Sequence, residues 1–560
     1  MKAWRHYSVL VLFLLSSGAL ALRVGYLTVT ERDFLQEQGN ARSVRTEEFP
    51  AHRGGIFDRH GEPLALSTPV NAVWADPSRS VFSAKQIQAI AGVLRLDVAA
   101  LEQTLAPGSN KQFVFIKRQV AQAQVQDLRS LDIEGLHFSQ EYKRFYPAAE
   151  SAAHVVGKTS VDDLGLEGIE LAFDDRLRGR PGAKRVLKDR RGDVIATLDY
   201  LRPAQYGQDL TLSIDMRLQY FAYRELKSAV AGQSAAAASL VLLDARSGEI
   251  LALANAPSYN PNEPQTGDYR GKRNLAVTDT YEPGSTIKPF TLLAALESGS
   301  FTAKSVIDTS PGYMRVGKKL IEDPLNRGSI TLARALQKSS QVAIAKLALA
   351  LQERAVFEVL ARAGIGDFIG TGLPGEATGY LTDEDLKRPI TRVTLAYGYG
   401  LSASPLQLAQ AYLSLAAKGQ RIPLSILKRE GTVPGDRVFD ERDTRAVLEM
   451  MELVTHAEGT APKARIPGYR IAGKTGTARK LHNGRYDDER HVALFAGVAP
   501  VSDPRIVMVV VVDEPGTRAS GGGAAAAPIF ARVGERALRL LGVVPDAPML
   551  IADGAGASRS

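Results

Sequence analysis

Ser285 and Lys288 have the residue types and the spacing of a serine nucleophile and its base. They lie in segment 281–289 (YEPGSTIKP), at the start of a helix predicted over residues 290–296. A spacing of three places both side chains on one helix face, and the positive end of the helix dipole favours an alkoxide. A lysine whose pKa is lowered by burial or by a nearby cation can remove the serine proton. The pair therefore predicts covalent catalysis through a seryl intermediate.

The same spacing recurs at Ser425 and Lys428. This second pair follows Pro423 in a basic stretch that is strand-like rather than helical. A two-residue motif outside its expected structural context carries little weight, so we interpret this pair as incidental.

Ser339 and Gln341 form a second polar group, on a turn predicted between helices at 330–337 and 342–351. A hydroxyl and a carboxamide two residues apart can relay a proton and hold a substrate amide. The alternative is that Ser339 or Ser340 only caps the following helix. The residues alone leave both interpretations open.

Segment 473–477 (GKTGT) is the third group, and with Gly468 it matches the phosphate-binding P-loop pattern letter for letter. A P-loop needs a buried strand before its first glycine and a helix that begins at the lysine. Residues 461–467 (APKARIP) are no strand, and the chain after 477 runs into an Asn-Gly hairpin signal. The context therefore argues against nucleotide binding.

The alternative for this segment is an edge strand over residues 470–480. Such a strand would present Lys474, Thr475 and Thr477 to a cleft. Gly476 would then let a substrate backbone approach closely.

The surrounding pattern predicts an α+β fold, in which helices are inserted between the early and late strands of an antiparallel sheet. The predicted strands are 238–244, 249–254, 469–480, 491–499 and 506–512, with a turn at 482–484, and the predicted helices are 216–231, several within 285–420, and 524–541. Residues 45–210 show no catalytic constellation, so we expect a mixed α+β docking module there.

The N-terminus predicts export. Lys2 and Arg5 precede an apolar run, and residues 8–29 are long enough to span a bilayer if Arg23 lies at the interface. A cleaved signal peptide ending near residues 19–21 (ALA) is the alternative.

Composition excludes several classes of site. The chain has no cysteine, which removes disulfides, Cys-based metal centres and a cysteine nucleophile. Its eight histidines have neither metal-ligand spacing nor a Ser-His-Asp arrangement, so we expect no metal and no organic cofactor. The net charge of +8 is spread along the chain and does not predict nucleic-acid binding.

The three motifs, in this order, resemble those of the penicillin-recognising serine acyltransferases, and the flanks resemble class B penicillin-binding proteins, above all their division-specific members. The flanking segments are 244–252 (DARSGEILA), 255–261 (NAPSYNP), 282–289, 396–407, 53–59 (RGGIFDR) and 165–168 (GLEG). The resemblance implies an antiparallel sheet with helical layers, as in the penicillin-binding and β-lactamase-like transpeptidase domain. It also favours the uncleaved anchor.

The resemblance implies the following organisation: a cytoplasmic end at 1–7, a transmembrane anchor at 8–29, a pedestal for dimerisation or docking at 45–210, a transpeptidase domain at 211–545 and a tail at 546–560. The protein would be a single-pass protein of the bacterial inner membrane with its catalytic domain in the periplasm. Expected partners are a membrane glycan polymerase of the FtsW type, other division proteins and the membrane itself.

By the same resemblance, the substrate is a peptidoglycan stem peptide ending in D-Ala-D-Ala, and β-lactams acylate Ser285. The resemblance implies that Ser285 is the nucleophile and Lys288 its base. Ser339 would relay the proton, and Lys474 would tune this relay electrostatically. The backbone N–H groups of Ser285 and Thr477 would form the oxyanion hole, and the substrate-binding residues would be Gln341, Thr475, Gly476 and Thr477. A neighbouring stem's amine would resolve the acyl-enzyme in a 4→3 cross-link.

One residue departs from the family pattern, which has Asn where this chain has Gln341. The carboxamide is kept but displaced by one methylene, which puts normal acylation and β-lactam response in doubt. The alternatives are therefore a D,D-carboxypeptidase or β-lactamase that uses water, a β-lactam sensor, and a catalytically weakened scaffold.

Overall fold

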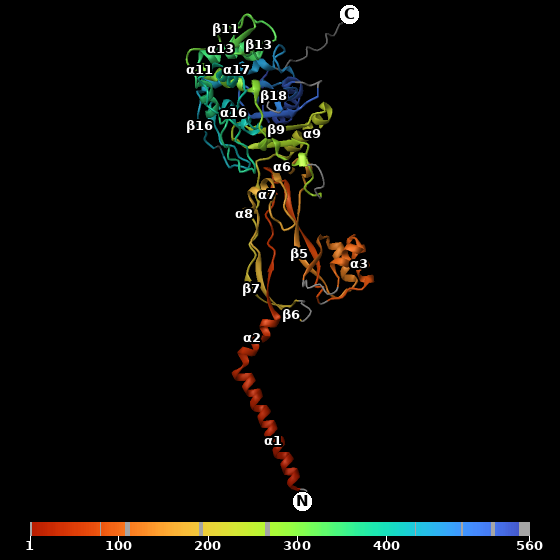
Figure 1. The fold of residues 1–560 in the computed structure, drawn as a ribbon. Helices are drawn as coiled ribbons and strands as arrows, with labels where there is room; N and C mark the ends of the chain where they lie inside the picture. Colours follow the sequence, from red (N-terminus) through yellow and green to blue (C-terminus); the bar gives the residue numbers. More distant parts are fainter. Residues whose placement is uncertain are drawn as a thin grey trace, which may run out of the picture. The chain divides into compact units, whose positions relative to one another are not determined.

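The computed structural model describes residues 3–78, 80–106, 113–189, 194–263, 269–431, 433–482, 485–516 and 521–547. The chain divides into two compact units (Figure 1). The first unit comprises Met1–Gly54, Ser67–Lys143 and Arg178–Gln208, and the second comprises Gly55–Leu66, Arg144–Leu177 and Asp209–Ser560. Two segments from the expected 45–210 module thus belong to the unit that carries the three motifs.

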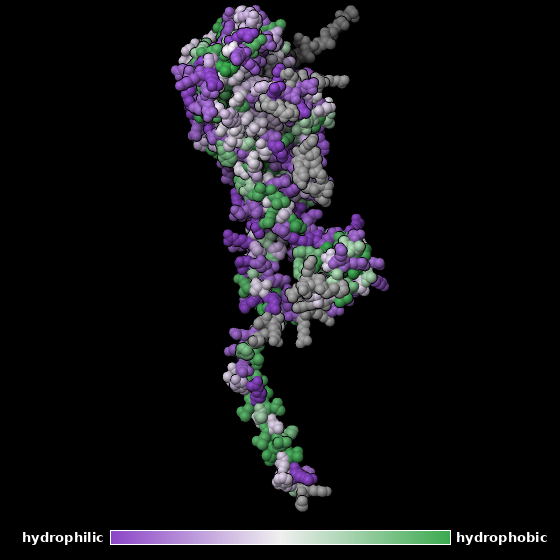
Figure 2. All heavy atoms as spheres, in the orientation of Figure 1, coloured by the Kyte–Doolittle hydropathy of each residue, from purple (hydrophilic) through white to green (hydrophobic). Residues whose placement is uncertain are grey.

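The first unit begins with helix α1 (Ala3–Gly25), which continues as a π-helical turn over Tyr26–Thr30. Within the described residues, the run Ala3–Thr30 is the one helix that is long and apolar enough to cross a membrane. Figure 2 shows hydrophobic side chains along it. The expected anchor over 8–29 lies inside this helix, which is followed by α2 (Arg32–Ser43).

Two small sheets complete the first unit. In one, β1 (Val44–Phe49), β6 (Gly182–Lys188) and β7 (Val194–Arg202) are antiparallel in the order β1-β6-β7. In the other, β3 (Pro63–Ala75) pairs with β4 (Val114–Val120) and with β5 (Leu136–Phe145). Three helices, α3 (Ala84–Leu94), α4 (Val98–Thr104) and α5 (Gln122–Ser130), enclose a core that includes Val73, Ile90 and Val125.

The second unit is built on a five-stranded antiparallel sheet in the order β10-β9-β19-β18-β17. The strands are β9 (Ala237–Asp244), β10 (Ile250–Ala256), β17 (Ala472–His482), β18 (Arg485–Ala499) and β19 (Ile506–Asp513). These positions confirm the predicted strands and place β17 at the edge. The Asn483-Gly484 turn itself lies outside the described residues, but pairing of His482 with Arg485 confirms the hairpin.

Helices pack against this sheet, with α9 (Met216–Gln233) and α19 (Ala527–Leu540) also in contact with each other. Phe530 of α19 stacks edge-on against Phe495 of β18, with ring centroids 4.8 Å apart. Helix α16 (Pro405–Ala416), which is buried at every residue, contacts β9, β18 and β19. The sheet strands are therefore mostly apolar and buried, because helices cover them.

The inserted layer is helical, as predicted, but contains strands that the sequence did not reveal. Its helices are α10 (Leu275–Thr278), α11 (Lys288–Glu297), α12 (Leu332–Gln337), α13 (Gln341–Ala350), α14 (Ala355–Arg362), α15 (Pro389–Ala396) and α17 (Glu441–Glu452). Two strand pairs, β11 (Val306–Asp308) with β14 (Ser329–Thr331) and β12 (Tyr313–Val316) with β13 (Lys319–Glu322), interrupt it. Strands of three or four residues are too short to show a period of two.

Short elements complete the second unit. They are β2 (Ile56–Phe57), α6 (Ala153–Val156), α7 (Gly168–Ala172), α8 (Asp174–Leu177), β8 (Leu210–Thr211), β15 (Gln420–Arg421), β16 (Asp436–Arg437), α18 (Gly522–Ala525) and 3₁₀ turns at Ala149–Ser151, Tyr269–Lys272, Gly284–Ile287, Leu453–Thr455 and Pro462–Ala464. At the start of the predicted tail, Asp546 accepts hydrogen bonds from the backbone N–H of Arg470 at 2.7 Å and of Ser502 at 3.2 Å.

Candidate active site

Ser285 lies on the 3₁₀ turn Gly284–Ile287, which leads directly into α11. The α-helix begins at Lys288, two residues before the predicted start. Two hydrogen bonds hold this turn. Gly284 N–H donates to the carbonyl of Gly398, a residue distant in sequence, at 3.0 Å, and Thr286 Oγ1 donates to the Pro283 carbonyl within the turn at 2.7 Å. The Ser285 side chain is partly exposed, as a nucleophile must be.

Lys288 is completely buried beneath this turn. Its Nζ donates to the Ser339 carbonyl at 2.6 Å and to Ser339 Oγ at 3.1 Å. Burial lowers the pKa of Lys288 to about 7, against the opposing effect of the Asp323 charge. A substantial fraction of this amine is therefore neutral near neutral pH and able to accept a proton.

Ser339 sits on the turn between α12 and α13, as predicted, in a left-handed backbone conformation with φ of 56°. The next residue, Ser340, caps α13 by accepting a hydrogen bond from Ala343 N–H at 3.0 Å. The capping interpretation is thus confirmed for Ser340. Ser340 caps the helix, and the Ser339 hydroxyl is free to contact the lysines.

Lys474 reaches the same hydroxyl from the sheet. It is completely buried on β17, and its Nζ donates to Ser339 Oγ and to the Thr475 carbonyl, each at 3.0 Å. Burial, together with the nearby charge of Lys288, lowers the pKa of Lys474 well below its usual value. Because Lys474 is in the middle of a strand and no helix begins there, the segment is not a P-loop.

Thr475 and Thr477 lie two positions apart on β17, so their side chains project from the same face of the edge strand. Thr475 Oγ1 lies 3.0 Å from Thr460 Oγ1, and Gly522 N–H donates to Thr477 Oγ1 at 3.4 Å. No sequence motif marks Thr460, which lies in a loop. Gln341, the first residue of α13, has an exposed side chain.

Packing gives position 476 a reason to be glycine that the sequence did not reveal. A Cβ atom there would lie 2.8 Å from the Pro283 carbonyl oxygen and 2.9 Å from Thr286 Cγ2, closer than van der Waals contact. The absence of a side chain therefore makes room for the turn that carries Ser285. The same packing brings the backbone of Gly284 against that of Thr477, since a Cβ on Gly284 would lie 3.3 Å from the Thr477 carbonyl oxygen.

Asp323, directly after β13, is a residue of the site that the sequence did not reveal. Its carboxylate accepts a short hydrogen bond from the Ser340 hydroxyl and further bonds from the N–H groups of Gln341 at 2.6 Å and Val342 at 3.3 Å. It thus holds the start of α13 and the turn beside it, and its negative charge raises the pKa of Lys288 against the effect of burial. No motif marks a lone aspartate on a short hairpin.

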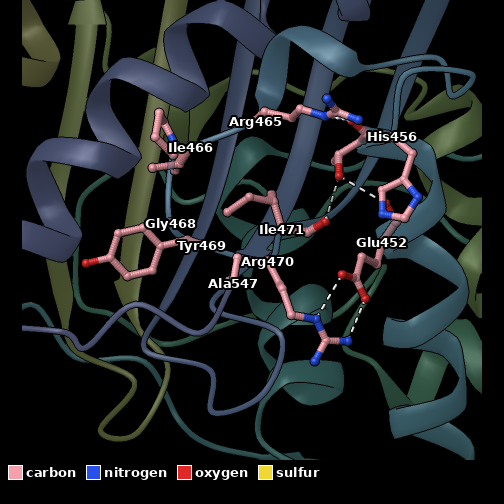
Figure 3. Close-up of a pocket in the computed structure, with 11 residues that line it drawn as sticks. Glu452, His456, Arg465, Ile466, Gly468, Tyr469, Arg470, Ile471 and Ala547 are labelled. Carbon is pink, nitrogen blue, oxygen red and sulfur yellow. Dashed lines mark hydrogen bonds and ion pairs between the residues drawn. The ribbon is translucent and has the colours of Figure 1, made fainter. Parts of the chain in front are cut away.

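Two other features do not belong to the site. Ser425 Oγ donates to the Leu427 carbonyl and Lys428 Nζ to the Arg59 carbonyl, so these two side chains serve the backbone and the pair is incidental. A cavity of about 530 Å³ between the end of α17 and the start of β17 (Figure 3) contains the Arg470–Glu452 ion pair at 2.7 Å but none of the motif residues.

Family models match both parts of the chain. The model described as penicillin-binding protein transpeptidase domain matches residues 238–535, and that described as penicillin-binding protein dimerisation domain matches residues 48–212. The chain belongs to the class B penicillin-binding proteins. This penicillin-binding protein is 41% identical to the peptidoglycan D,D-transpeptidase FtsI of Escherichia coli, over 97% of its own length and 93% of that protein.

Other relatives agree. The probable peptidoglycan D,D-transpeptidase PbpC of Pseudomonas aeruginosa is 38% identical over 97% of this chain and 96% of its own. Among solved structures, penicillin-binding protein 3 of Mycobacterium tuberculosis in complex with aztreonam has a TM-score of 0.68 at 26% identity, covering 90% of this chain and 99% of its own. The protein is accordingly a serine-type peptidoglycan D,D-transpeptidase, of a family that acts on stem peptides and binds β-lactams.

The buried state of Lys288 predicts a pH-dependent acylation rate. Only the neutral amine can take a proton, so the rate of Ser285 acylation by a fluorescent penicillin should fall about tenfold per pH unit below about pH 7. Gel quantification of the labelled full-length protein in detergent, at several pH values, measures this. A rate that stays constant between about pH 5 and pH 8 would contradict it.

The contacts of Asp323 predict two effects of Asp323→Asn. Removal of the negative charge lowers the pKa of Lys288 further, so the acidic limb of the acylation profile should move to lower pH. The maximal rate should fall by about tenfold, because the turn at Ser340 loses a charged acceptor. The neighbouring exposed carboxylate offers a matched control, Glu322→Gln, which should change neither. An unshifted limb would show that Asp323 acts only on stability.

Proposed function

We propose that Ser285 is the acylated nucleophile and that Lys288, Ser339 and Lys474 form one proton-transfer network behind it. The observation that carries the proposal is the convergence on a single atom. Ser339 Oγ lies 3.1 Å from Lys288 Nζ and 3.0 Å from Lys474 Nζ, although the three residues come from a helix, a turn and a strand. The peptidoglycan D,D-transpeptidase names of the relatives support the reaction class.

In the proposed reaction, these residues act in the following order. Neutral Lys288 removes the Ser285 proton, and Oγ attacks the carbonyl of the penultimate D-Ala of a stem peptide. The backbone N–H groups of Ser285 and Thr477 stabilise the oxyanion, and the contact of Gly284 with Thr477 supports their proximity. The intermediate collapses as the proton passes through Ser339 to the departing D-Ala amine, while Lys474 stabilises the relay. Thr475 and Thr477 receive the terminal carboxylate.

The acyl-enzyme is then resolved by a neighbouring stem. That stem's side-chain amine attacks the ester, the Ser285 proton is restored, and a 4→3 cross-link forms. A β-lactam acylates the same serine, and its product is not displaced by an amine. In the alternative, a D,D-carboxypeptidase or weakened scaffold, Gln341 would be the cause, but the lysine–serine network does not involve its side chain.

The proposed setting is septal synthesis at the bacterial cytoplasmic membrane. The apolar helix Ala3–Thr30 supports the proposal of an uncleaved single-pass anchor with the catalytic unit in the periplasm. The match of residues 48–212 to a dimerisation-domain model supports a docking role for the pedestal, with an FtsW-type glycan polymerase and other division proteins as its partners. The FtsI name of a relative supports the septal role.

The nucleophile assignment predicts that fluorescent penicillin labels the wild type and not Ser285→Ala. Loss of the hydroxyl removes the only atom that forms the ester, while the rest of the site stays packed. Label on both proteins, or on neither, would contradict the assignment. Incubation with a cognate glycan polymerase and lipid-linked substrate then distinguishes cross-linking from D-Ala release alone, which would indicate a carboxypeptidase.

The exposed Gln341 predicts altered β-lactam affinity with retained activity. Gln341→Asn shortens the side chain by one methylene but keeps the backbone N–H that binds Asp323. We expect second-order acylation constants for several β-lactams to change by about threefold to tenfold, unequally among drugs. Stopped-flow competition with a fluorescent penicillin measures them. Unchanged constants for all drugs would show that the extra methylene has no effect.

A further inference from the structure

Glu282, three residues before Ser285, has one carboxylate oxygen that the proposed mechanism leaves unexplained. Its Oε1 accepts hydrogen bonds from Gly400 N–H at 2.9 Å and from the Tyr486 hydroxyl at 3.1 Å. Its Oε2 is buried, and within the described part of the chain it has no hydrogen-bond partner. A buried carboxylate oxygen without a partner is costly, so it calls for a missing donor.

Aromatic rings surround this carboxylate. The ring centroids of Tyr397 and Tyr399 lie 5.8 Å apart, as do those of Tyr399 and Tyr486, and both pairs meet edge to face. Burial is the main cause that raises the pKa of Tyr399, and the charge of Glu282 raises it further, so Tyr399 and Glu282 lie close together. A carboxylate beside tyrosine rings attracts a cation through both its charge and the ring faces.

The group lies next to the reacting serine. Glu282 shares a loop with Ser285, and Tyr486 pairs with Leu481 near the end of the strand that carries Lys474, Thr475 and Thr477. In a peptide bound along β17 and acylated at Ser285, the residue before the penultimate D-Ala would therefore lie near this group. A second peptide bound beside the first could also reach it. Tyr486 is 42% exposed, so the group reaches the protein surface at this ring.

We propose that Glu282, Tyr399 and Tyr486 form a subsite for the side-chain ammonium of a stem peptide's diamino residue. The ammonium donates the hydrogen bond that Oε2 lacks and lies against the tyrosine faces. The inference rests on the proposed function, because it uses the stem peptide as substrate. The same ammonium chemistry is found on the donor stem, where it is a recognition group, and on the acceptor stem, where it becomes the attacking amine.

The test is Glu282→Gln in the full-length protein, which keeps the shape and the bonds of Oε1 and removes only the charge. In the donor arm, D-Ala release is compared for a pentapeptide with a free side-chain amine and the same peptide acetylated at that amine. The wild type should prefer the free amine about tenfold, as expected for one charge-assisted hydrogen bond, and Glu282→Gln should lose the preference. In the acceptor arm, the ratio of cross-linked to hydrolysed product is measured at increasing acceptor concentration, and it should fall in the variant if the acceptor uses the subsite.

Two controls keep the outcomes apart. Asp503→Asn, which changes an exposed carboxylate paired with Arg246, should behave as wild type in both arms and in acylation by fluorescent penicillin. A change in either arm with normal penicillin labelling supports the subsite. Equal loss for free and acetylated donors, with an unchanged product ratio, overturns it. Absence of penicillin labelling in the wild type overturns the proposed function, and the subsite with it.

Discussion

Two buried lysines that share one hydroxyl are the constraint on which the site depends. Lys288 and Lys474 are both fully buried and both donate to Ser339 Oγ. Two ammonium groups cannot stay charged so close together without solvent, so burial and mutual repulsion keep at least one of them neutral. The protein obtains a base near neutral pH from two residues that are ordinarily protonated. The Ser339 hydroxyl joins the two amines into one hydrogen-bond network, which the proposed mechanism uses to carry a proton from Ser285 toward the leaving group.

Two separate layers of the fold hold these two amines in place. Lys288 belongs to the helical layer and Lys474 to the edge strand of the sheet, and the contact between the layers is close enough to require glycine at position 476. Ser339 completes the network from a left-handed backbone conformation, which a non-glycine residue adopts only when its surroundings impose it. Asp323 supplies that support through three hydrogen bonds to the start of α13. Small shifts in any layer would therefore separate the amines from the hydroxyl.

The sequence predicted those parts whose signals are local. Alternation and apolar runs located β17 and β19 to within three residues and the start of β18 to within six. Spacing singled out Lys288, Ser339 and Lys474, whose polar atoms the structure brings together. It did not predict Asp323 or Thr460, because each contributes a single polar atom from a short loop and acts through a contact distant in sequence. It also did not reveal the packing at Gly476, since a glycine required by packing looks the same in sequence as one required by a ligand. The strand pairs β11–β14 and β12–β13 escaped because they are shorter than the pattern that would reveal them.

The position of Gln341 explains how the chain departs from its family pattern without losing the network. The turn before α13 is held through the Ser340 hydroxyl and through backbone N–H groups, including that of Gln341 itself, and none of these bonds uses the Gln341 side chain. Both lysines donate hydrogen bonds to Ser339, and these bonds do not involve Gln341. In the proposed mechanism, proton transfer and contact with the ligand thus depend on different atoms of one short motif. A longer carboxamide would change how far the site extends toward a ligand. The pKa of Lys288 would stay governed by burial and Asp323, and that of Lys474 by burial and Lys288.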